Sequence, residues 1–553
     1  MNKVLIFCLL LVSWNVSLAQ NDYPKLDEIK RSLDKLSLEY PGYFSYKVLT
    51  ESPGGNPVFL AKAGKGDEEL TPGLFFLSGI DGKHPAGTMA VLSLAEKVLS
   101  EGADLLDQYY FYFLPVLSPD AYSQYHADLQ FERTGNGRET DIDRDGRISE
   151  DPFEDLNGDG LITQVRIEDP TGSWVVHERD SRILLPIKER KSNQLIYRLI
   201  TEGIDNDKDG QFNEDGPGGV NLNMNFSFDY PAFKPGAGEH AISEKENRAL
   251  AEFLFEHWNI YAVFTFALEN NLSHPINFDR QKVSRRIITG PLERDAGTFQ
   301  KVSNVFDDNW AIKDAPVMGQ GPGSFSSWAY FHYCRFSFVS PAWWAPLVVS
   351  EENAEQNESD EELKSTSISE KELKENYDLR YVQWAETAGL QDFFVDWEEI
   401  EHPDFPTRKA EVGGFKPFVR NNPPAIFLEE SVDNYFSFIR EFCSRMPSLE
   451  FADFQIEKLE NRVFRISGRV INSSIFPTST HLGDRTRWVR DIRNRILLND
   501  DQELLVGHHS TFHKSLDAGE YFEFSWLVSG GGKVTLDVGS PMTGMREKNI
   551  ELK

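Results

Sequence analysis

The fold class is decided by the stretch Leu74-Phe75-Phe76-Leu77-Ser78-Gly79-Ile80-Asp81-Gly82-Lys83-His84. Its first four residues are a short apolar run typical of a buried strand, and the glycines that follow are typical of a turn. A helical pattern comes next, and its apolar residues near one face are Met89, Leu92, Ala95 and Leu99. Residues 109–117 are a further apolar run. Strand, helix and strand in this order predict an α/β domain with a parallel or mixed central sheet flanked by helices.

The same alternation returns further along the chain. Ser243 and Glu246 have the spacing of a capping box, which predicts the start of a helix. We expect this helix to bury Leu250, Phe253, Leu254 and Trp258. Residues 260–268 and 335–340 are apolar enough to be two more strands of the same sheet. The α/β domain is therefore expected over residues 20–447.

Two polar segments interrupt this domain, and a different pattern follows it. Residues 131–219 are rich in Gly and Asp and show little periodicity, which indicates an insertion. Residues 350–375 form an acidic Glu/Ser/Lys tract that is too polar to bury a core. We interpret this tract as a solvated or disordered loop, with an interaction tail as the alternative. From residue 448 onward apolar residues alternate with polar ones, which predicts a C-terminal β-sandwich over residues 448–553.

Charge and hydropathy exclude several classes of partner. The formal charge is −31 in 553 residues, so the surface repels nucleic acid and anionic lipid, which proteins bind through Lys and Arg. No later segment reaches the roughly 18 apolar residues of a membrane span, so we expect none. Residues 1–19 have the Lys, the apolar run and the small residues of a signal peptide. We therefore expect a secreted protein, either periplasmic or extracellular. The oligomeric state and the pairing of Cys334 with Cys443 stay open.

Five short motifs carry a family resemblance. One is the turn of residues 79–84. The others are Pro115-Val116-Leu117-Ser118-Pro119-Asp120, Gly219-Val220-Asn221-Leu222-Asn223-Met224-Asn225-Phe226, Ser243-Glu244-Lys245-Glu246 and Ser327-Trp328-Ala329-Tyr330. In this order they resemble the landmarks of the zinc carboxypeptidase family, of the carboxypeptidase A and T type. Five motifs in the right order are a specific signal. The resemblance implies the family's α/β fold.

The resemblance also implies a metal site, and the chain has replaced its key residues. Members of the family hold zinc with two His and one Glu, and a second Glu removes a proton from the bound water. The ligand positions fall here on Asp81, His84 and Ala267, and the position of the base falls on Pro341. Alanine and proline neither bind a metal nor accept a proton. A zinc ion held by Asp81 and His84 would need a third ligand, such as Glu269 or His274.

The substrate-binding residues of the family are partly kept. An Asn-Arg pair binds the C-terminal carboxylate of the substrate in relatives, and its positions fall on Asn223 and Met224. Arg133 stands where the family has the Arg that stabilises the oxyanion. We expect Asn223 and Arg133 to contact a ligand, although the cleft has lost the Arg that would fix a carboxylate.

A second metal is indicated by the insertion. Three segments, beginning at residues 141, 155 and 205, place carboxylate or amide oxygens at positions 1, 3 and 5 and Gly at position 6, which is the pattern of a calcium loop. They depart from an EF-hand because position 12 is not Glu. The alternative is a set of acidic turns. The predicted calcium ligands are Asp141, Asp143, Asp145, Glu150, Asp151, Asp155, Asn157, Asp159, Asp205, Asp207, Asp209, Glu214 and Asp215.

Three functional hypotheses follow. The first is a pseudopeptidase, whose carboxypeptidase-like cleft binds a peptide, glycan or cell-wall fragment without cutting it. The second is an active metallocarboxypeptidase that has rebuilt its metal site around Asp81 and His84 and hydrolyses C-terminal or cell-wall peptides. The third is a calcium-stiffened extracellular scaffold in which the β-sandwich binds the partner. The sequence does not decide whether the protein is an enzyme.

Overall fold

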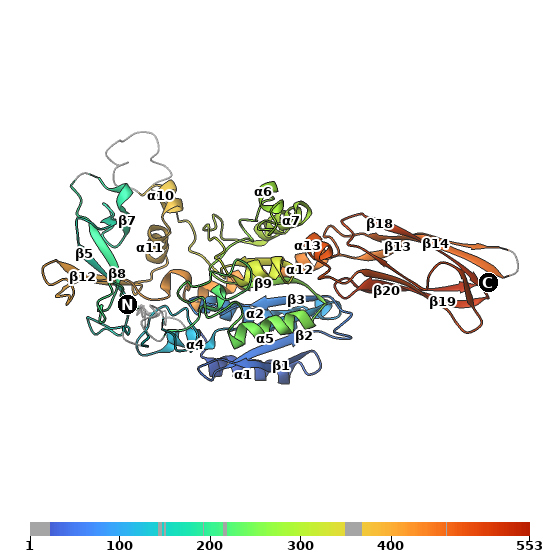
Figure 1. Cartoon of the computed structure of the whole chain (residues 1–553), viewed down its shortest axis with the longest axis horizontal. Coiled ribbons are helices and arrows are strands. Elements are labelled where there is room, and N and C mark those ends of the chain that lie inside the picture. The colour runs from blue at the N-terminus through green and yellow to red at the C-terminus, as the bar shows by residue number, and fades with distance from the viewer. Residues whose placement is uncertain are drawn as a thin grey trace, which may run out of the picture.

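The computed structural model describes residues 23–141, 146–148, 151–191, 193–213, 218–348, 368–459 and 462–553. The predicted signal peptide, residues 1–19, lies outside these residues, and so does most of the predicted acidic loop. The end of that loop is not irregular as predicted, because its last six residues form the helix α10 (Glu370–Glu375). Figure 1 shows an elongated molecule with the β-sandwich at one end, the α/β domain in the middle and a second sheet at the other end.

The α/β domain is built on a six-stranded mixed sheet in the order β1-β2-β4-β3-β9-β10. Its four parallel strands are β3 (Gly73–Leu77), β4 (Tyr110–Leu114), β9 (Ile260–Phe266) and β10 (Phe336–Ser340). The antiparallel strands β1 (Phe44–Glu51) and β2 (Pro57–Ala63) extend one edge. Every residue of the four parallel strands is buried, which explains their continuous apolar runs. The predicted mixed sheet is confirmed.

Helices cover both faces of this sheet, and each face has its own core. Leu74 and Phe76 of β3 pack on the face covered by α1 (Leu26–Glu39), α2 (Pro85–Glu101), α7 (Glu293–Asn309) and α12 (Glu429–Ser444). Phe75 and Leu77 point to the opposite face, which α5 (Lys245–Glu256) and α8 (Phe325–Phe331) cover. The remaining short helices of this domain are α3 (Ala103–Leu106), α4 (Pro119–Ser123), α6 (Arg280–Val283) and α11 (Tyr377–Thr387).

The predicted capping box is wrong. Helix α5 begins after Glu244, and no side chain caps it. The Glu246 carboxylate is instead buried and accepts a hydrogen bond from the Asn136 amide (3.1 Å), so it is not available to the helix terminus. The helix buries Leu250, Phe253 and Leu254 as expected, but Trp258 lies beyond its end and is only partly buried.

The insertion forms a second sheet that the sequence did not reveal. Six antiparallel strands stand in the order β11-β12-β5-β8-β6-β7. Four come from the insertion, β5 (Gln164–Glu168), β6 (Trp174–Val176), β7 (Leu184–Pro186) and β8 (Tyr197–Thr201). Their partners β11 (Phe394–Ile400) and β12 (Ala410–Phe415) come from the far end of the α/β domain. The strands of the insertion have only three to five residues each, too few to show an alternating pattern.

The C-terminal region is a β-sandwich, as predicted. One sheet has the order β13-β14-β18-β16 and the other β17-β15-β19-β20, and all their pairs are antiparallel. The strands are β13 (Leu449–Lys458), β14 (Val463–Asn472), β15 (Ile492–Leu497), β16 (Glu503–Val506), β17 (Ser510–His513), β18 (Tyr521–Ser529), β19 (Gly532–Ser540) and β20 (Gly544–Leu552). A separate apolar core fills the space between the sheets. The helix α13 (His481–Thr486) lies where the sandwich meets the α/β domain (Figure 1).

Two further expectations concern cysteines and membranes. Cys334 and Cys443 are both buried and are free thiols, so they do not pair with each other. Within the part of the chain that the structure covers, no helix combines the length and the apolar character needed to cross a bilayer.

A buried carboxylate joins the α/β domain to the sandwich. Asp295 of α7 accepts hydrogen bonds from the backbone N–H groups of His481 (2.7 Å) and Leu482 (3.0 Å), which open α13. It also accepts one from the Tyr330 hydroxyl (2.7 Å). Burial raises the pKa of Asp295, and these three donors oppose the shift. The carboxylate thereby fixes the start of α13 against the helical layer of the α/β domain.

Asp295→Asn should destabilise the protein, because the amide can accept from only one side and leaves a buried donor unsatisfied. We expect a loss of about 1–3 kcal/mol in the free energy of unfolding, measured by chemical denaturation. Asp308→Asn, an exposed change on the same helix, is the matched control and should have no effect. Equal stability of the two variants would contradict this role for Asp295.

Candidate functional site

The residues predicted from the motifs gather at one edge of the central sheet. Parallel strands end on the same side, so the segments that follow β3, β9 and β10 meet there, as is usual for ligand sites in such sheets. Asp81 and His84 follow β3, Ala267 follows β9, and Pro341 follows β10. Asn223 lies on the short 3-10 helix η3 (Leu222–Met224), which packs against the same edge through a hydrogen bond to Glu269.

His84 is held by the backbone rather than directed at an open site. Its side chain is buried, with 1% of the residue exposed. The Ala342 backbone N–H donates a hydrogen bond to Nε2 of His84 (2.9 Å), so Nε2 carries no proton and its lone pair is in use. Burial lowers the pKa of His84 to about 4, which keeps the ring neutral at physiological pH. The ring therefore ties the end of β10 to the turn after β3, across the end of β9.

The position of the family's general base lies in the apolar core. Pro341 is buried, and its carbonyl accepts a hydrogen bond from the Tyr435 hydroxyl of α12 (3.1 Å). Trp343 and Trp344 follow and are also buried, with their rings 4.6 Å from Trp384 and 5.0 Å from Trp310 respectively. No carboxylate is supplied by this segment.

The residues at this edge do not fit a zinc ion with three protein ligands. Ala267 offers no donor atom. Because Nε2 of His84 accepts the Ala342 N–H, the ring proton lies on Nδ1, which has no hydrogen-bond partner among the described residues, so neither ring nitrogen offers a free lone pair. His274 is exposed and its ring bonds to the Ala315 carbonyl (3.0 Å), so it does not replace the missing ligand. Asp81 is half-buried, and burial raises its pKa. Among the described residues, three His, Cys, Asp or Glu side chains bring their ligand atoms within 4.8 Å of one another only at Asp205, Asp207 and Asp209, which lie in the insertion and not at this edge.

Glu269 is the central charged group of the site. It is 5% exposed, and its two oxygens accept hydrogen bonds from the Asn223 amide (2.8 Å) and from the Ser326 hydroxyl. Burial raises the pKa of Glu269 to about 7, these hydrogen bonds oppose the shift, and the nearby Asp81 carboxylate adds to it. Asn223 is thus already bound to a carboxylate of the chain itself. The sequence offered Glu269 only as a substitute ligand, because nothing near it in the chain indicates its partners.

Arg133 supports its own loop. Its Nε donates to the Gly135 carbonyl (2.9 Å) and its Nη2 to the Asn136 carbonyl (2.6 Å), and burial lowers its pKa. Asp120, the last residue of the Pro115 motif, holds the same region. Its carboxylate accepts hydrogen bonds from Gly137 N–H (2.7 Å) and from the Ser52 hydroxyl (2.6 Å). These motif residues therefore shape the wall of the site.

A cavity of about 500 Å³ opens beside the turn that carries Lys83. Lys83 and Glu132 line it and form an ion pair (3.5 Å). The second sheet provides the opposite wall, with Trp174 of β6 and Trp397 of β11, and both rings are half-buried. This cavity could not be predicted from the sequence, because the short strands that line it have no alternating pattern.

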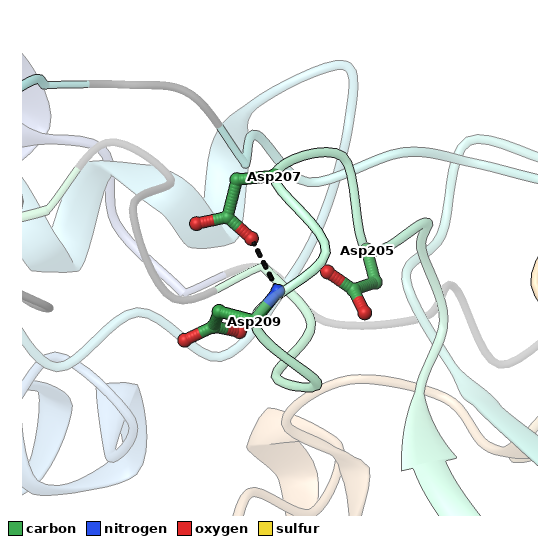
Figure 2. A group of neighbouring side chains, drawn as sticks. All are labelled: Asp205, Asp207 and Asp209. Carbon is green, nitrogen blue, oxygen red and sulfur yellow. Dashed lines mark hydrogen bonds between the residues drawn. The ribbon is translucent and has the colours of Figure 1, made fainter.

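Part of the predicted calcium site is visible. Figure 2 shows Asp205, Asp207 and Asp209 around one turn, and their ligand atoms lie within 4.8 Å of one another. Asp205 is 8% exposed and its Oδ1 has no hydrogen-bond partner among the described residues. The Asp207 carboxylate accepts a hydrogen bond from the Asp209 backbone N–H (3.0 Å).

The other predicted calcium ligands have diverse positions. Asp151 is buried and accepts hydrogen bonds from the N–H groups of Asn206 (2.8 Å) and Asn213 (3.0 Å), so it supports the third loop. Asp155 accepts from three N–H groups of its own turn, and Asn157 and Asp159 each accept from one backbone N–H. Asp141 accepts from Gly146 N–H (3.0 Å). The predicted ligands outside the described residues are Asp143, Asp145, Glu150, Glu214 and Asp215.

Comparison with known proteins agrees with this class of fold. The central mixed sheet, with helices on both faces and its motifs at the carboxyl edge, defines an α/β carboxypeptidase-like domain. A family model described as zinc carboxypeptidase matches residues 29–168, and one described as a domain of unknown function matches residues 448–551. Residues 29–168 of the chain are thus similar to the zinc carboxypeptidase family.

Individual relatives are similar only in part. Carboxypeptidase B of Astacus astacus is 30% identical over 109 residues, which are 19% of this chain and 36% of that protein. The chain thus spans about a third of the length of this relative. Carboxypeptidase A of Helicoverpa armigera is 13% identical with a TM-score of 0.37, over 61% of this chain and 69% of that one. Thrombin-activatable fibrinolysis inhibitor is 15% identical with a TM-score of 0.36, over 58% and 66%.

Glu269 should make the stability of the protein fall as pH rises. Between pH 4.5 and about 7 the Glu269 carboxyl is ionised in the unfolded chain but still protonated in the folded one. The free energy of unfolding therefore decreases as the pH rises through this range. The full effect is roughly 3 kcal/mol. Glu269→Gln should remove this loss, and denaturation at pH 5 and pH 8 measures it. Glu252→Gln, an exposed change, is the control, and an unchanged pH dependence in Glu269→Gln would contradict the assignment.

Proposed function

We propose that this protein is a pseudopeptidase, which binds a peptide or cell-wall fragment in a carboxypeptidase-like cleft without hydrolysing it. One observation carries the proposal. The Nε2 lone pair of His84, which stands at a metal-ligand position of the family, accepts the N–H of Ala342, the residue that follows the lost base. A metal ion at this place would have to break that hydrogen bond inside the core, and Ala267 would still leave it one ligand short.

The charges of the site support a ligand different from that of an active carboxypeptidase. In relatives an Asn-Arg pair binds the free carboxylate at the end of the substrate. Here Met224 replaces the Arg, and Asn223 donates to Glu269. With Asp81 also close to Glu269, a second carboxylate at this place would be repelled. The edge of the sheet therefore favours a ligand group that donates hydrogen bonds, such as an amine or an amide.

The volume and the lining of the adjacent cavity indicate the size and the chemical type of the ligand. Its volume of about 500 Å³ is in the range of small-molecule and short-peptide sites. Four cationic side chains line it, but each faces a carboxylate, so the cavity presents charges of both signs. Its Trp rings offer flat apolar surfaces to a sugar ring or an apolar side chain. A cell-wall fragment combines these features, and the predicted signal peptide supports a periplasmic or extracellular location for this binding.

An active enzyme with a rebuilt site is the alternative. The raised pKa of Glu269 favours it, since a carboxyl group that titrates near pH 7 suits acid–base chemistry. The hydrogen bonds to both oxygens of Glu269 favour a structural role instead.

We further propose that the insertion binds calcium. The support is the repeated spacing of acidic residues together with the buried Oδ1 of Asp205, which lacks a hydrogen-bond partner in the described part of the chain. The ion would neutralise the mutual repulsion of Asp205, Asp207 and Asp209 and would stiffen the second sheet that walls the cavity.

Binding without hydrolysis is the expected behaviour of the purified mature chain. A panel of C-terminal peptides and muropeptides, incubated with the protein and added zinc, should give no product by mass spectrometry. Calorimetry should detect binding of at least one muropeptide. Trp174→Ala should weaken that binding at least about tenfold, because a half-buried Trp in a cavity is a typical anchor.

Tyr521→Ala, an exposed aromatic change on the sandwich, is the matched control and should bind like the unchanged protein. Zinc-dependent hydrolysis that a chelator stops would refute the pseudopeptidase and support the rebuilt enzyme. Binding that survives Trp174→Ala but is lost without residues 448–553 would favour the scaffold hypothesis.

Calcium should stabilise the protein. At a calcium concentration of 100 times the Kd, one site adds about 2.7 kcal/mol to the free energy of unfolding. Removal of calcium with EGTA should therefore lower the Tm. Asp205→Asn should abolish most of the difference between the Tm in calcium and the Tm in EGTA. Asp396→Asn, an exposed change on β11, should leave the difference intact. A Tm that does not respond to EGTA would reject the calcium site.

A further inference from the structure

A second cavity lies where the β-sandwich meets the α/β domain. Its volume is about 580 Å³. One wall is formed by residues 487–491, between α13 and β15, together with Arg493 of β15, and the turn between β19 and β20 forms another. Leu70, from the loop before β3, closes the side toward the α/β domain. This cavity is separate from the one beside Lys83 and shares no lining residue with it.

The lining is strongly cationic in a chain that is strongly anionic. Four lining side chains are positive, Arg487, Arg490, Arg493 and Lys514, and one is negative, Asp491. Lys514 is paired with Asp484 (3.1 Å). Arg487 and Arg493 have no ion pair or side-chain hydrogen bond within the described residues, and the Arg490 guanidinium stacks on the Trp258 ring at 3.8 Å. The net charge of the chain is −31, yet among the described residues no carboxylate forms an ion pair with Arg487, Arg490 or Arg493.

The backbone of Arg487 adds a second observation. It ends α13 in the left-handed conformation, with φ of 64°. Glycine is the usual residue at this place in a helix, because a side chain is disfavoured there. The Arg487 side chain is exposed and lines the cavity, and keeping it there has a conformational cost that glycine would not have.

We propose that this junction cavity binds a compact ligand that carries at least two phosphate, sulfate or carboxylate groups. Guanidinium groups bind such oxyanions through paired hydrogen bonds, and a concave cationic surface concentrates them. The volume fits a small ligand of roughly 300–1,000 Å³. A long polyanion does not fit, because most of it would lie against the anionic remainder of the surface. Phe512, which is 66% exposed, offers an apolar face to the uncharged part of the ligand.

The proposal is independent of what the cleft in the α/β domain binds. Calorimetry of the mature full-length chain with inorganic pyrophosphate and with citrate tests it, and the two probes distinguish a phosphate ligand from a carboxylate ligand. We expect binding of at least one probe, weakened by added NaCl because the site is open to solvent. Arg490→Gln should raise the Kd of the probe about tenfold, as expected for the loss of one charge-assisted contact.

Arg487→Gly is the sharper variant. It removes a positive charge, so the Kd of the probe should rise about tenfold. Glycine also adopts the left-handed conformation without strain, so the Tm should rise or stay the same. Arg465→Gln, on the sandwich but paired with Glu457 (2.8 Å), is the control and should bind normally. The proposal is overturned if neither probe binds, if both cavity variants bind as tightly as the control, or if only a long polyanion such as heparin binds.

Discussion

The hydrogen bond from the Ala342 N–H to Nε2 of His84 constrains the whole edge of the central sheet. It joins residues that are 258 positions apart and fixes the turn after β3 against the end of β10. The imidazole that makes it is buried and neutral, since burial lowers its pKa to about 4. Its Nε2 accepts the Ala342 N–H, while its buried Nδ1 has no hydrogen-bond partner among the described residues. His84 therefore lies in the buried interior, where its ring joins the turn after β3 to the end of β10.

This constraint changes the electrostatics of the neighbouring groups. A zinc ion would supply positive charge at the centre of a site rich in carboxylates. Without that charge, Asp81 and Glu269 must tolerate each other, and burial raises the pKa of both carboxyl groups. Asn223 and Ser326 partly compensate through hydrogen bonds. Asn223 thus stabilises an internal acid of the chain.

Within the α/β domain, the sequence predicted the strands that are buried on both faces and missed those that are not. Residues 74–77 and 260–266 read as strands because every side chain is apolar. The strands β6 and β7 have three residues each, and the sheet that contains them is completed by residues such as Glu411, which bonds to Arg166 at a separation of 245 positions. Motifs likewise located Asp81, His84 and Asn223, but a motif does not show what a side chain touches. Ala342, which bonds to His84, and Glu269, which bonds to Asn223, are close to these residues in space but far from them in the sequence.

The fold tolerates these losses because the site contributes little to the forces that hold the domain together. Two apolar cores, one on each face of the central sheet, include Phe75, Phe76 and the helices around them, and none of the substituted motif positions interrupts them. Ala267 and Pro341 are both buried, so they contribute apolar surface to the interior at these two positions. The walls of the cleft are held by Asp120 and Arg133 through hydrogen bonds that do not involve Ala267 or Pro341.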